Sequence, residues 1–193
     1  MQDWLTYSIH DFLLFSPEVY WYLVERHINH FGPVLVFWQV INVAALYLSH
    51  VKQTAIYCLL PLTLNWLLLG GVFYLQQYSQ INPYAKYLGY LSLLQAITIL
   101  LLLRSSFDSK SIKKTHLKSV HLKAAAALLI LLPIFLAVFQ HQWTLATVGV
   151  MPLPTIFTSL ILLCAMPRKL LLLPLPMLLL TIEALTLITI KGL

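Results

Sequence analysis

Glu183 is the one acidic side chain that lies well inside an apolar segment of this sequence. Counted from residue 170, where the segment begins, it lies ~20 Å into a bilayer core that is ~30 Å thick. A carboxyl group at that depth is costly to bury, so it is a candidate functional residue. Two structural interpretations compete: a protonated Glu183 that hydrogen-bonds a neighbouring helix, or a Glu183 that reaches water at the outer interface.

Four uncharged polar residues occur at similar depth in other apolar segments. Gln39 and Asn42 are three residues apart, and so are Thr155 and Thr158, so each pair shares one face of a helix. Such faces turn toward the bundle interior, because lipid offers no hydrogen-bond partner. Contacts between helices are the favoured interpretation. The sharper hypothesis is an outward-open polar pocket lined by Gln39, Asn42, Thr155, Thr158 and Glu183.

Metal and redox chemistry have weak support. His27 and His30 are three residues apart, a spacing that can hold a metal, but no HExxH or CxxC pattern accompanies them. Cys58 and Cys164 both fall inside apolar segments, where small buried hydrophobes are the simplest interpretation. No phosphate-binding glycine loop, nucleophile elbow or paired carboxylates occur, so no cofactor is expected and an enzyme is the weakest hypothesis.

Composition places the chain in a membrane. Its 193 residues are 60% hydrophobic and 9% charged, whereas a soluble domain carries about 25% charged residues. The formal charge of +6 does not indicate nucleic-acid binding, because the cations concentrate in loops beside apolar segments, where the positive-inside rule explains them.

The apolar pattern predicts an all-α integral membrane protein with about six transmembrane helices. Residues 1–32 are too short and polar to cross and form a separate interfacial segment, in which Ser16-Pro17-Glu18 is a strong helix start. This amphipathic helix is expected to end at Gly32-Pro33. Residues 33–193 form the bundle, with crossings at 33–51, 55–75, 84–103, 123–140, 148–166 and 170–190.

The distribution of cations orients the bundle. Residues 104–123 form a basic loop. Together with Lys52, Arg168 and Lys169 it places nine Lys and Arg residues on one side, against Arg26, Lys86 and Lys191 on the other. The first side is therefore cytoplasmic, and both termini lie outside. Within the loop, anionic lipid headgroups or a cytoplasmic partner are expected to meet Lys110, Lys113, Lys114 and Lys118.

Three stretches resemble a family of bacterial multi-pass inner-membrane proteins that is described as a domain of unknown function, with some members loosely labelled permeases. They are YSIHDFLLFSPEVY at residues 7–20, YSQINPYAKYLGYLSLLQ at 78–95 and VGVMPLPTIFTSLILL at 148–163. The resemblance implies the same fold and an inner-membrane location, and it implies no established activity. In that location the outer side, where the cation count places both termini, is the periplasm. The position between Pro152 and Pro154, often Cys in that family, is Leu153 here, so this chain has no thiol there.

The sequence is compatible with three functions. The first is a non-catalytic permease-like or accessory membrane component, the second a structural or assembly subunit of a larger membrane complex, and the third an enzyme with an outward-facing site. The expected partners are the bilayer with its anionic lipids, and either further copies of the chain or a larger membrane complex. Pro152 and Pro154 are expected to start a helix rather than to form a broken-helix binding site.

Overall fold

The computed structural model describes residues 16–52, 54–108, 119–140, 147–164 and 172–191, and its regular elements are all helices. The α-helices α1 and α2 are followed by a π-helix, η3, and a short 3-10 turn, η4. Four further α-helices complete the described chain. The bounds are α1 Pro17–Lys52, α2 Ile56–Leu68, η3 Leu69–Gln77, η4 Tyr78–Gln80, α3 Ala85–Asp108, α4 Ser119–Gln140, α5 Pro152–Leu163 and α7 Pro174–Lys191.

The all-helical prediction is confirmed, and three segments are long and apolar enough to cross a membrane. These are Val34–Lys52, Ile56–Gln80 and Ala85–Arg104, close to the first three predicted crossings. Three shorter apolar helices follow at Val120–Pro133, Pro152–Leu163 and Pro174–Thr189. By length and composition the chain therefore has the character of a membrane protein, while the count of six crossings stays a prediction.

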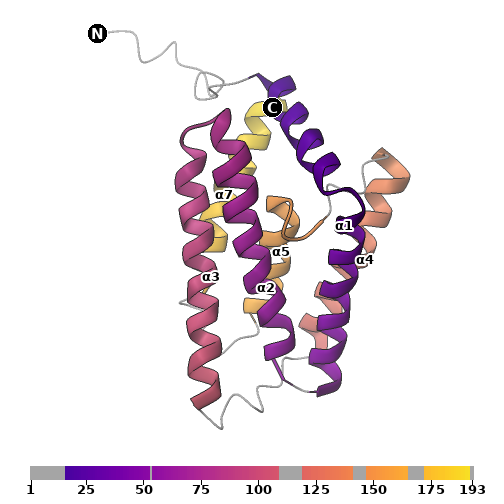
Figure 1. Cartoon of the computed structure of the whole chain (residues 1–193). Helices are drawn as coiled ribbons and strands as arrows, with labels where there is room; N and C mark the ends of the chain where they lie inside the picture. The colour runs from indigo at the N-terminus through magenta and orange to yellow at the C-terminus, as the bar shows by residue number, and fades with distance from the viewer. Residues whose placement is uncertain (1–15, 53, 109–118, 141–146, 165–171, 192–193) are drawn as a thin grey trace.

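Successive helices run in opposite directions (Figure 1). The start of α1, the start of α3 and the end of α7 lie at one end of the bundle, drawn at the top and here called the upper end. The end of α1, the end of α3 and the start of α4 lie at the lower end. Helix α2 packs against α1 and α3, and α5 packs against α4 and α7. The core lies where these antiparallel neighbours meet.

Helix α1 corrects one prediction. It begins at Pro17 as expected, and a hydrogen bond from Ser16 holds the pKa of the Glu18 carboxyl below its usual value. It does not end at Gly32-Pro33, however, but continues unbroken to Lys52. A proline removes one helical hydrogen bond and bends a helix, and packing against neighbours can carry the helix past it. Figure 1 shows α1 changing direction about midway.

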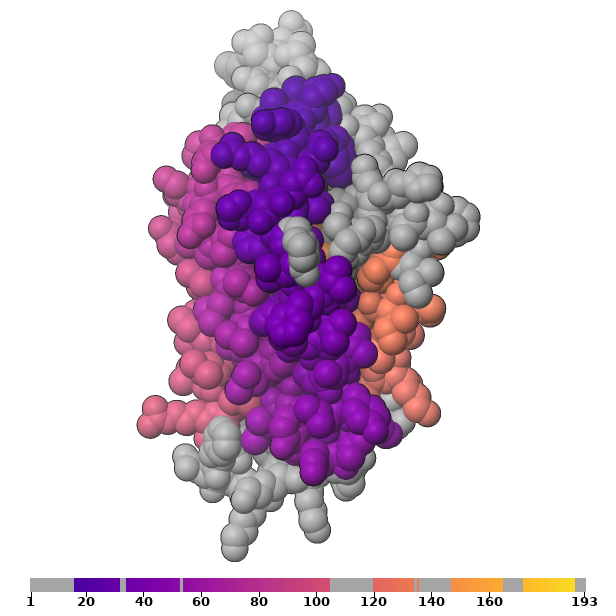
Figure 2. All heavy atoms as spheres, turned by 45° about the vertical axis from the view of Figure 1, so that its right-hand side comes forward, coloured from indigo at the N-terminus to yellow at the C-terminus, as the bar shows by residue number. Residues whose placement is uncertain are grey.

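The first half of α1 packs on the bundle. Tyr20, Val24 and His27 are buried along one stripe of the helix, whereas Trp21 is 39% exposed. The ring of Tyr20 meets Tyr78 edge-on, with centroids 5.8 Å apart. Figure 2 shows α1 running over one face of the molecule, with α4 beside its lower half. The proposed interfacial helix is thus the first part of a longer packed helix, and its amphipathic character is not confirmed.

A close approach of backbones joins η3 to α3. A Cβ added at Gly70 would lie 3.0 Å from the carbonyl oxygen of Gly89, and one added at Gly89 would lie 2.7 Å from the Leu75 side chain. Small residues allow this kind of contact between membrane helices. The contact holds the π-helix against α3 and fixes the direction in which the rest of η3 projects its side chains.

Helix α5 begins inside the bundle rather than at its end, as Figure 1 shows. It starts at Pro152, as the proline pattern predicted, and follows a short turn in which Val148 pairs with Met151. Residues 147–151 are all buried. At Gly149, φ is +84°, in the left-handed region that favours glycine. The predicted crossing 148–166 is therefore a buried turn followed by a shorter helix.

We predict that Gly149→Ala destabilises the protein by more than about 1 kcal/mol, because its backbone conformation disfavours any Cβ. The added Cβ would also lie 2.5 Å from Asn65 Oδ1 and 2.9 Å from Trp38 Nε1. Thermal unfolding of the purified protein in detergent measures the effect, as a fall of several degrees.

The matched control is Gly71→Ala, since Gly71 is helical and a Cβ there meets nothing within 4 Å. It should leave the melting temperature unchanged or raise it slightly. Equal melting temperatures for the two variants would contradict the role given to Gly149.

Candidate functional site

The buried turn at 147–151 is held by one hydrogen bond within the turn and by hydrogen bonds to side chains of α5 and α1. The Gly149 amide donates to Thr155 Oγ1 over 2.6 Å, and the Met151 amide donates to the carbonyl of Thr147 over 3.0 Å. The Val148 amide donates to Gln39 Oε1 over 3.4 Å. Backbone inside an apolar medium has to be satisfied internally, and α5 and α1 supply the acceptors here.

Gln39 ties three parts of the chain together. Its Oε1 receives the Val148 amide, while its Nε2 donates to the carbonyl of Leu129 on α4 over 2.8 Å. One side chain thus links α1, α4 and the turn. Both ends of this amide are used in contacts within the fold, which is the behaviour expected of a residue that joins helices.

A second set of hydrogen bonds joins α1 to α2 beside Gly149. Trp38 Nε1 donates to Asn65 Oδ1 over 2.8 Å, and Asn65 Nδ2 donates to Asn42 Oδ1 over 2.7 Å. Asn42 Nδ2 in turn donates to the carbonyl of Trp38 over 2.9 Å. Both asparagines are buried. The three side chains form a closed circuit against which Gly149 packs.

Helix α5 carries a third set. Thr155 Oγ1 donates to the Met151 carbonyl over 2.7 Å, and Ser159 Oγ donates to the Thr155 carbonyl over 2.6 Å. Trp66 Nε1 on α2 donates to Ser159 Oγ over 2.8 Å. Thr158 Oγ1 has no hydrogen-bond partner among the described residues and adjoins a cavity of only about 10 Å³ that Asn42 also lines. This space is too small for a solute.

Glu183 belongs to a different set of residues. Its side chain on α7 is 3% exposed, and its Oε1 accepts a 2.5 Å hydrogen bond from the Tyr74 hydroxyl on η3. Within the described residues its hydrogen-bond partner is thus a hydroxyl group rather than a Lys or Arg side chain. A carboxyl group buried with a single neutral donor has the low solvation and spare acceptor capacity of a binding or proton-carrying group.

A cavity of about 100 Å³ reaches Glu183. Its walls come from the first half of α1, the start of α5 and the second half of α7. Two aromatic rings, those of Tyr20 and Trp21, lie on one wall, with their centroids 5.3 Å apart. The remaining walls are apolar apart from Glu183 itself and are made by Met151, Pro152, Leu153, Pro154 and Leu187.

The five residues predicted to line one polar pocket therefore separate. Hydrogen bonds place Gln39 and Thr155 on the buried turn, and Asn42 beside them on Asn65. Thr158 shares a small cavity with Asn42. No described contact joins Glu183 to any of the four. Gln39, Asn42 and Thr155 make contacts within the fold, and the candidate site contracts to Glu183, Tyr74 and the cavity of about 100 Å³.

The two histidines proposed as metal ligands, His27 and His30, lie in different surroundings. His27 is buried between the rings of Phe31 and Phe73, with centroids 5.0 and 5.3 Å away, whereas His30 is exposed. Burial lowers the pKa of His27 to about 4, against the opposing effects of the Gln77 side chain and the Val150 backbone. No group of three or more His, Cys, Asp or Glu side chains that could hold a metal occurs in the described part of the chain.

Two other predictions have different outcomes. The basic residues Lys110, Lys113, Lys114 and Lys118 lie outside the described residues. Cys58 is buried, as predicted, but Cys164 is exposed, so the prediction was wrong for Cys164. The isolated chain exposes it at the end of α5, the position of a residue that faces lipid or solvent.

Sequence reasoning missed Tyr74. It lies in an apolar, aromatic stretch, and only its hydroxyl distinguishes it from its neighbours. Trp66 was likewise indistinguishable from an ordinary membrane-helix residue, although it is completely buried. One general rule could have pointed to a tyrosine. A buried carboxyl group on one helix requires a hydrogen-bond donor on another, and the tyrosine hydroxyl is a common donor.

Comparisons with protein-family models, with curated proteins and with solved structures give no match to this chain. The resemblance drawn from the three sequence stretches therefore stays a prediction, and the site is interpreted from its own geometry.

We predict that Asn65→Leu destabilises the protein by about 1–2 kcal/mol, because it leaves the Trp38 indole N–H and one Asn42 oxygen without their partner. Thermal unfolding in detergent measures it. The control is Thr98→Val, which removes an exposed hydroxyl bonded only to its own helix at the Leu94 carbonyl. A loss for Asn65→Leu no larger than that of Thr98→Val would show that the circuit adds little.

Proposed function

We propose that this chain is a non-catalytic, permease-like protein of a bacterial inner membrane that crosses the bilayer six times. Three long apolar helices, three shorter ones and their alternating directions support the count. Lys52 ends α1, Arg104 lies in the last part of α3 and Lys123 in the first part of α4, all toward the lower end. The sequence adds four lysines between α3 and α4, and Arg168 and Lys169 between α5 and α7. The resulting nine cations, against three at the upper end, favour a cytoplasmic lower end and a periplasmic upper end.

The bound solute we propose is a small cation of the ammonium type, held at Glu183. The observation that carries this is the cavity of about 100 Å³, in which the carboxyl meets the rings of Tyr20 and Trp21. A carboxylate together with aromatic rings is a combination that attracts ammonium groups. The cavity size limits the group to a few heavy atoms.

The start of α5 is compatible with a cation although helix starts ordinarily favour anions. Pro152 and Pro154 both line the cavity, and neither residue has a backbone N–H. The donors that make a helix start attractive to anions are therefore reduced at this wall.

A structural or assembly subunit is the second candidate. It is favoured by the polar contacts around residues 147–151, where Gln39, Asn65 and Thr155 are engaged by other parts of the fold. A protein of that kind needs no solute cavity, so binding at Glu183 distinguishes the two candidates.

We predict a specific pattern of labelling by a membrane-impermeant maleimide. In a background of Cys58→Ala and Cys164→Ala, Ser16→Cys and Lys86→Cys should react from outside intact cells. Ser16 directly precedes α1 and Lys86 lies in the first turn of α3, and both helices start at the upper end. Arg104→Cys should react only after lysis. Labelling of Arg104→Cys from outside, or of Ser16→Cys and Lys86→Cys from opposite sides, would contradict six crossings with external termini.

We predict that methylammonium raises the melting temperature of the purified protein by several degrees at saturation, because a ligand that binds only the folded state stabilises it. Glu183→Gln should abolish the rise. The variant keeps an oxygen that can accept from Tyr74, so the fold is expected to persist. Thermal unfolding in detergent at a series of methylammonium concentrations is the measurement.

Thr181→Val is the matched control, because Thr181 lies on the same helix and bonds only the Met177 carbonyl of that helix. It should retain the full methylammonium effect. Sodium chloride at equal concentrations controls for ionic strength. An equal rise in wild-type protein and Glu183→Gln would exclude the Glu183 cavity as the cation site, and no rise in the wild type would favour the assembly subunit.

A further inference from the structure

Two cavities lie in line along the seam between α1 and the α2–η3 helix. The first is lined by residues from 19 to 30 of α1 and from 76 to 81 opposite. The second is lined by residues from 27 to 38 of α1, by Leu68 and Val72 opposite, and by Gly149 and Val150 of the buried turn. The two therefore follow one another from the upper end of the bundle toward its middle. We call them the polar cavity and the apolar cavity.

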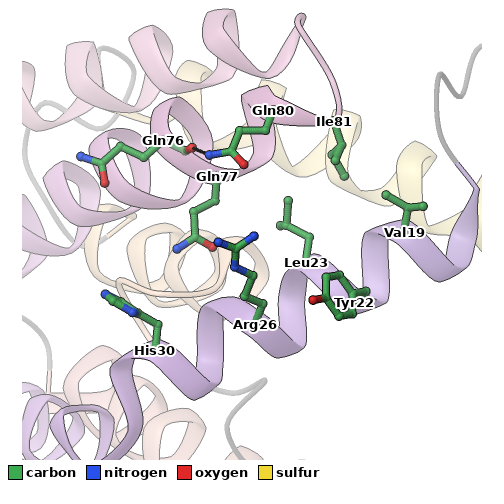
Figure 3. Close-up of a pocket in the computed structure, with 9 residues that line it drawn as sticks. All are labelled: Val19, Tyr22, Leu23, Arg26, His30, Gln76, Gln77, Gln80 and Ile81. Atoms are coloured by element: carbon green, nitrogen blue, oxygen red, sulfur yellow. Dashed lines mark hydrogen bonds between the residues drawn. The ribbon is translucent and has the colours of Figure 1, made fainter.

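The polar cavity measures about 620 Å³, within the range of small-molecule sites. Figure 3 shows the Arg26 side chain rising from α1 into the gap, with Gln77 reaching toward it from the opposite helix. Hydrogen-bonding side chains supply much of its lining: Tyr22, Arg26, His30, Gln76, Gln77 and Gln80.

The charge of this cavity is positive. Its lining includes Arg26 and His30 but no Asp or Glu. Figure 3 draws no hydrogen bond between the Arg26 guanidinium and the other lining residues. The planar fork of this group matches phosphate and carboxylate oxygens. The glutamine amides add neutral donors. The chemistry suits an anionic group with several acceptor oxygens.

The apolar cavity measures about 240 Å³ and is lined almost wholly by hydrocarbon. Its walls include Phe31, Leu35, Trp38, Leu68 and Val72. It begins at His27, about two turns further along α1 than the polar cavity, which begins at Val19. A soluble anion would make no use of this second space, whereas a hydrocarbon chain attached to the anion would fill it.

His27 lies at the junction of the two. It lines the apolar cavity, is 1% exposed, and neither of its ring nitrogens makes a hydrogen bond within the described residues. It adjoins Gln77 of the polar cavity closely enough to be influenced by that side chain. A buried imidazole with unused hydrogen-bonding capacity marks a place where a polar group of a ligand is accommodated.

We propose that this seam binds an anionic phospholipid of the leaflet at the upper end. The phosphate-bearing headgroup occupies the polar cavity at Arg26, the ester region passes His27, and one hydrocarbon chain enters the apolar cavity. The order along the seam, from charged to polar to apolar, is the order of groups along a phospholipid. The site shares no lining residue with the Glu183 cavity and does not depend on the proposed cation binding.

The experiment is native mass spectrometry of the full-length protein in a neutral detergent, titrated with dioctanoyl phosphatidylglycerol. The wild type is expected to bind one molecule more tightly than it binds dioctanoyl phosphatidylcholine. Arg26→Gln should weaken phosphatidylglycerol binding about tenfold, the size expected when a charge-assisted contact is lost. Lys86→Gln removes a cation at the same end that lies outside the cavity, and should leave binding unchanged.

A second pair of variants tests whether a hydrocarbon chain of the lipid occupies the apolar cavity. Val72→Phe fills part of the apolar cavity and should weaken phosphatidylglycerol binding, whereas Val40→Phe makes the same change at an exposed position of α1 and should not. Glycerol phosphate, which has the headgroup but no chain, should compete poorly. Glu183→Gln should bind phosphatidylglycerol like the wild type, which separates this proposal from the cation site.

Three results would overturn the proposal. Equal weakening by Arg26→Gln and Lys86→Gln would reveal only general attraction to a basic surface. Competition by glycerol phosphate at the concentration at which the lipid competes would reduce the seam to a soluble-anion site. Unchanged phosphatidylglycerol binding in Val72→Phe would show that no hydrocarbon chain of the lipid enters the apolar cavity. Should Arg26→Gln fail to fold, Arg26→Lys, which keeps the charge but lacks the fork, serves in its place and should weaken binding less than tenfold.

Discussion

The need to satisfy backbone groups in an apolar interior governs how this bundle is built. A turn in the middle of a membrane-like core exposes amide and carbonyl groups that lipid cannot pair. Each backbone group left without a hydrogen bond there costs on the order of several kcal/mol. The chain places such a turn at 147–151 and surrounds it with polar side chains from α1 and α5. The presence of Gln39 and Thr155 inside apolar segments is thus explained first by this turn.

Starting α5 inside the bundle has a consequence for the opposite side of that helix. Because α5 begins partway along the bundle, the space above its first residues is not filled by α5 itself. Pro152 and Pro154 line the cavity at Glu183, while Thr155 faces the turn. One feature of the backbone therefore produces both a tightly bonded region and a small cavity, on two sides of the same helix start.

The π-helix η3 supplies the partner for the buried acid. A π-helix has more residues per turn than an α-helix, which changes the direction in which its side chains point, and it is often found at functional sites. Here it carries Tyr74, which is fully buried and bonded to Glu183, and Gly70, which packs against Gly89 of α3. The close contact between Gly70 and Gly89 holds η3 against α3. The backbone of Tyr74 is therefore fixed where its hydroxyl can reach the Glu183 carboxyl.

The sequence predicted the helical class, the first three apolar helices and the helix starts at Pro17 and Pro152, because hydropathy and capping act over a few residues. It could not predict that α1 continues through Gly32-Pro33, since that outcome depends on packing partners that override a local breaker. Nor could it pair Glu183 with Tyr74, which are 109 positions apart. Polar side chains could be assigned to the interior, but their partners follow only from how the helices pack.

The first half of α1 is the element that connects the two proposed sites. Tyr20 and Trp21 form a wall of the Glu183 cavity, while the next two residues, Tyr22 and Leu23, line the polar cavity on another side of the helix. Had this segment lain flat on the membrane surface, neither cavity would have had this wall. This segment contacts η3, where His27 meets Phe73, and η4, where Tyr20 meets Tyr78. These contacts are therefore a structural requirement of both sites, although the lining residues of the two sites are separate.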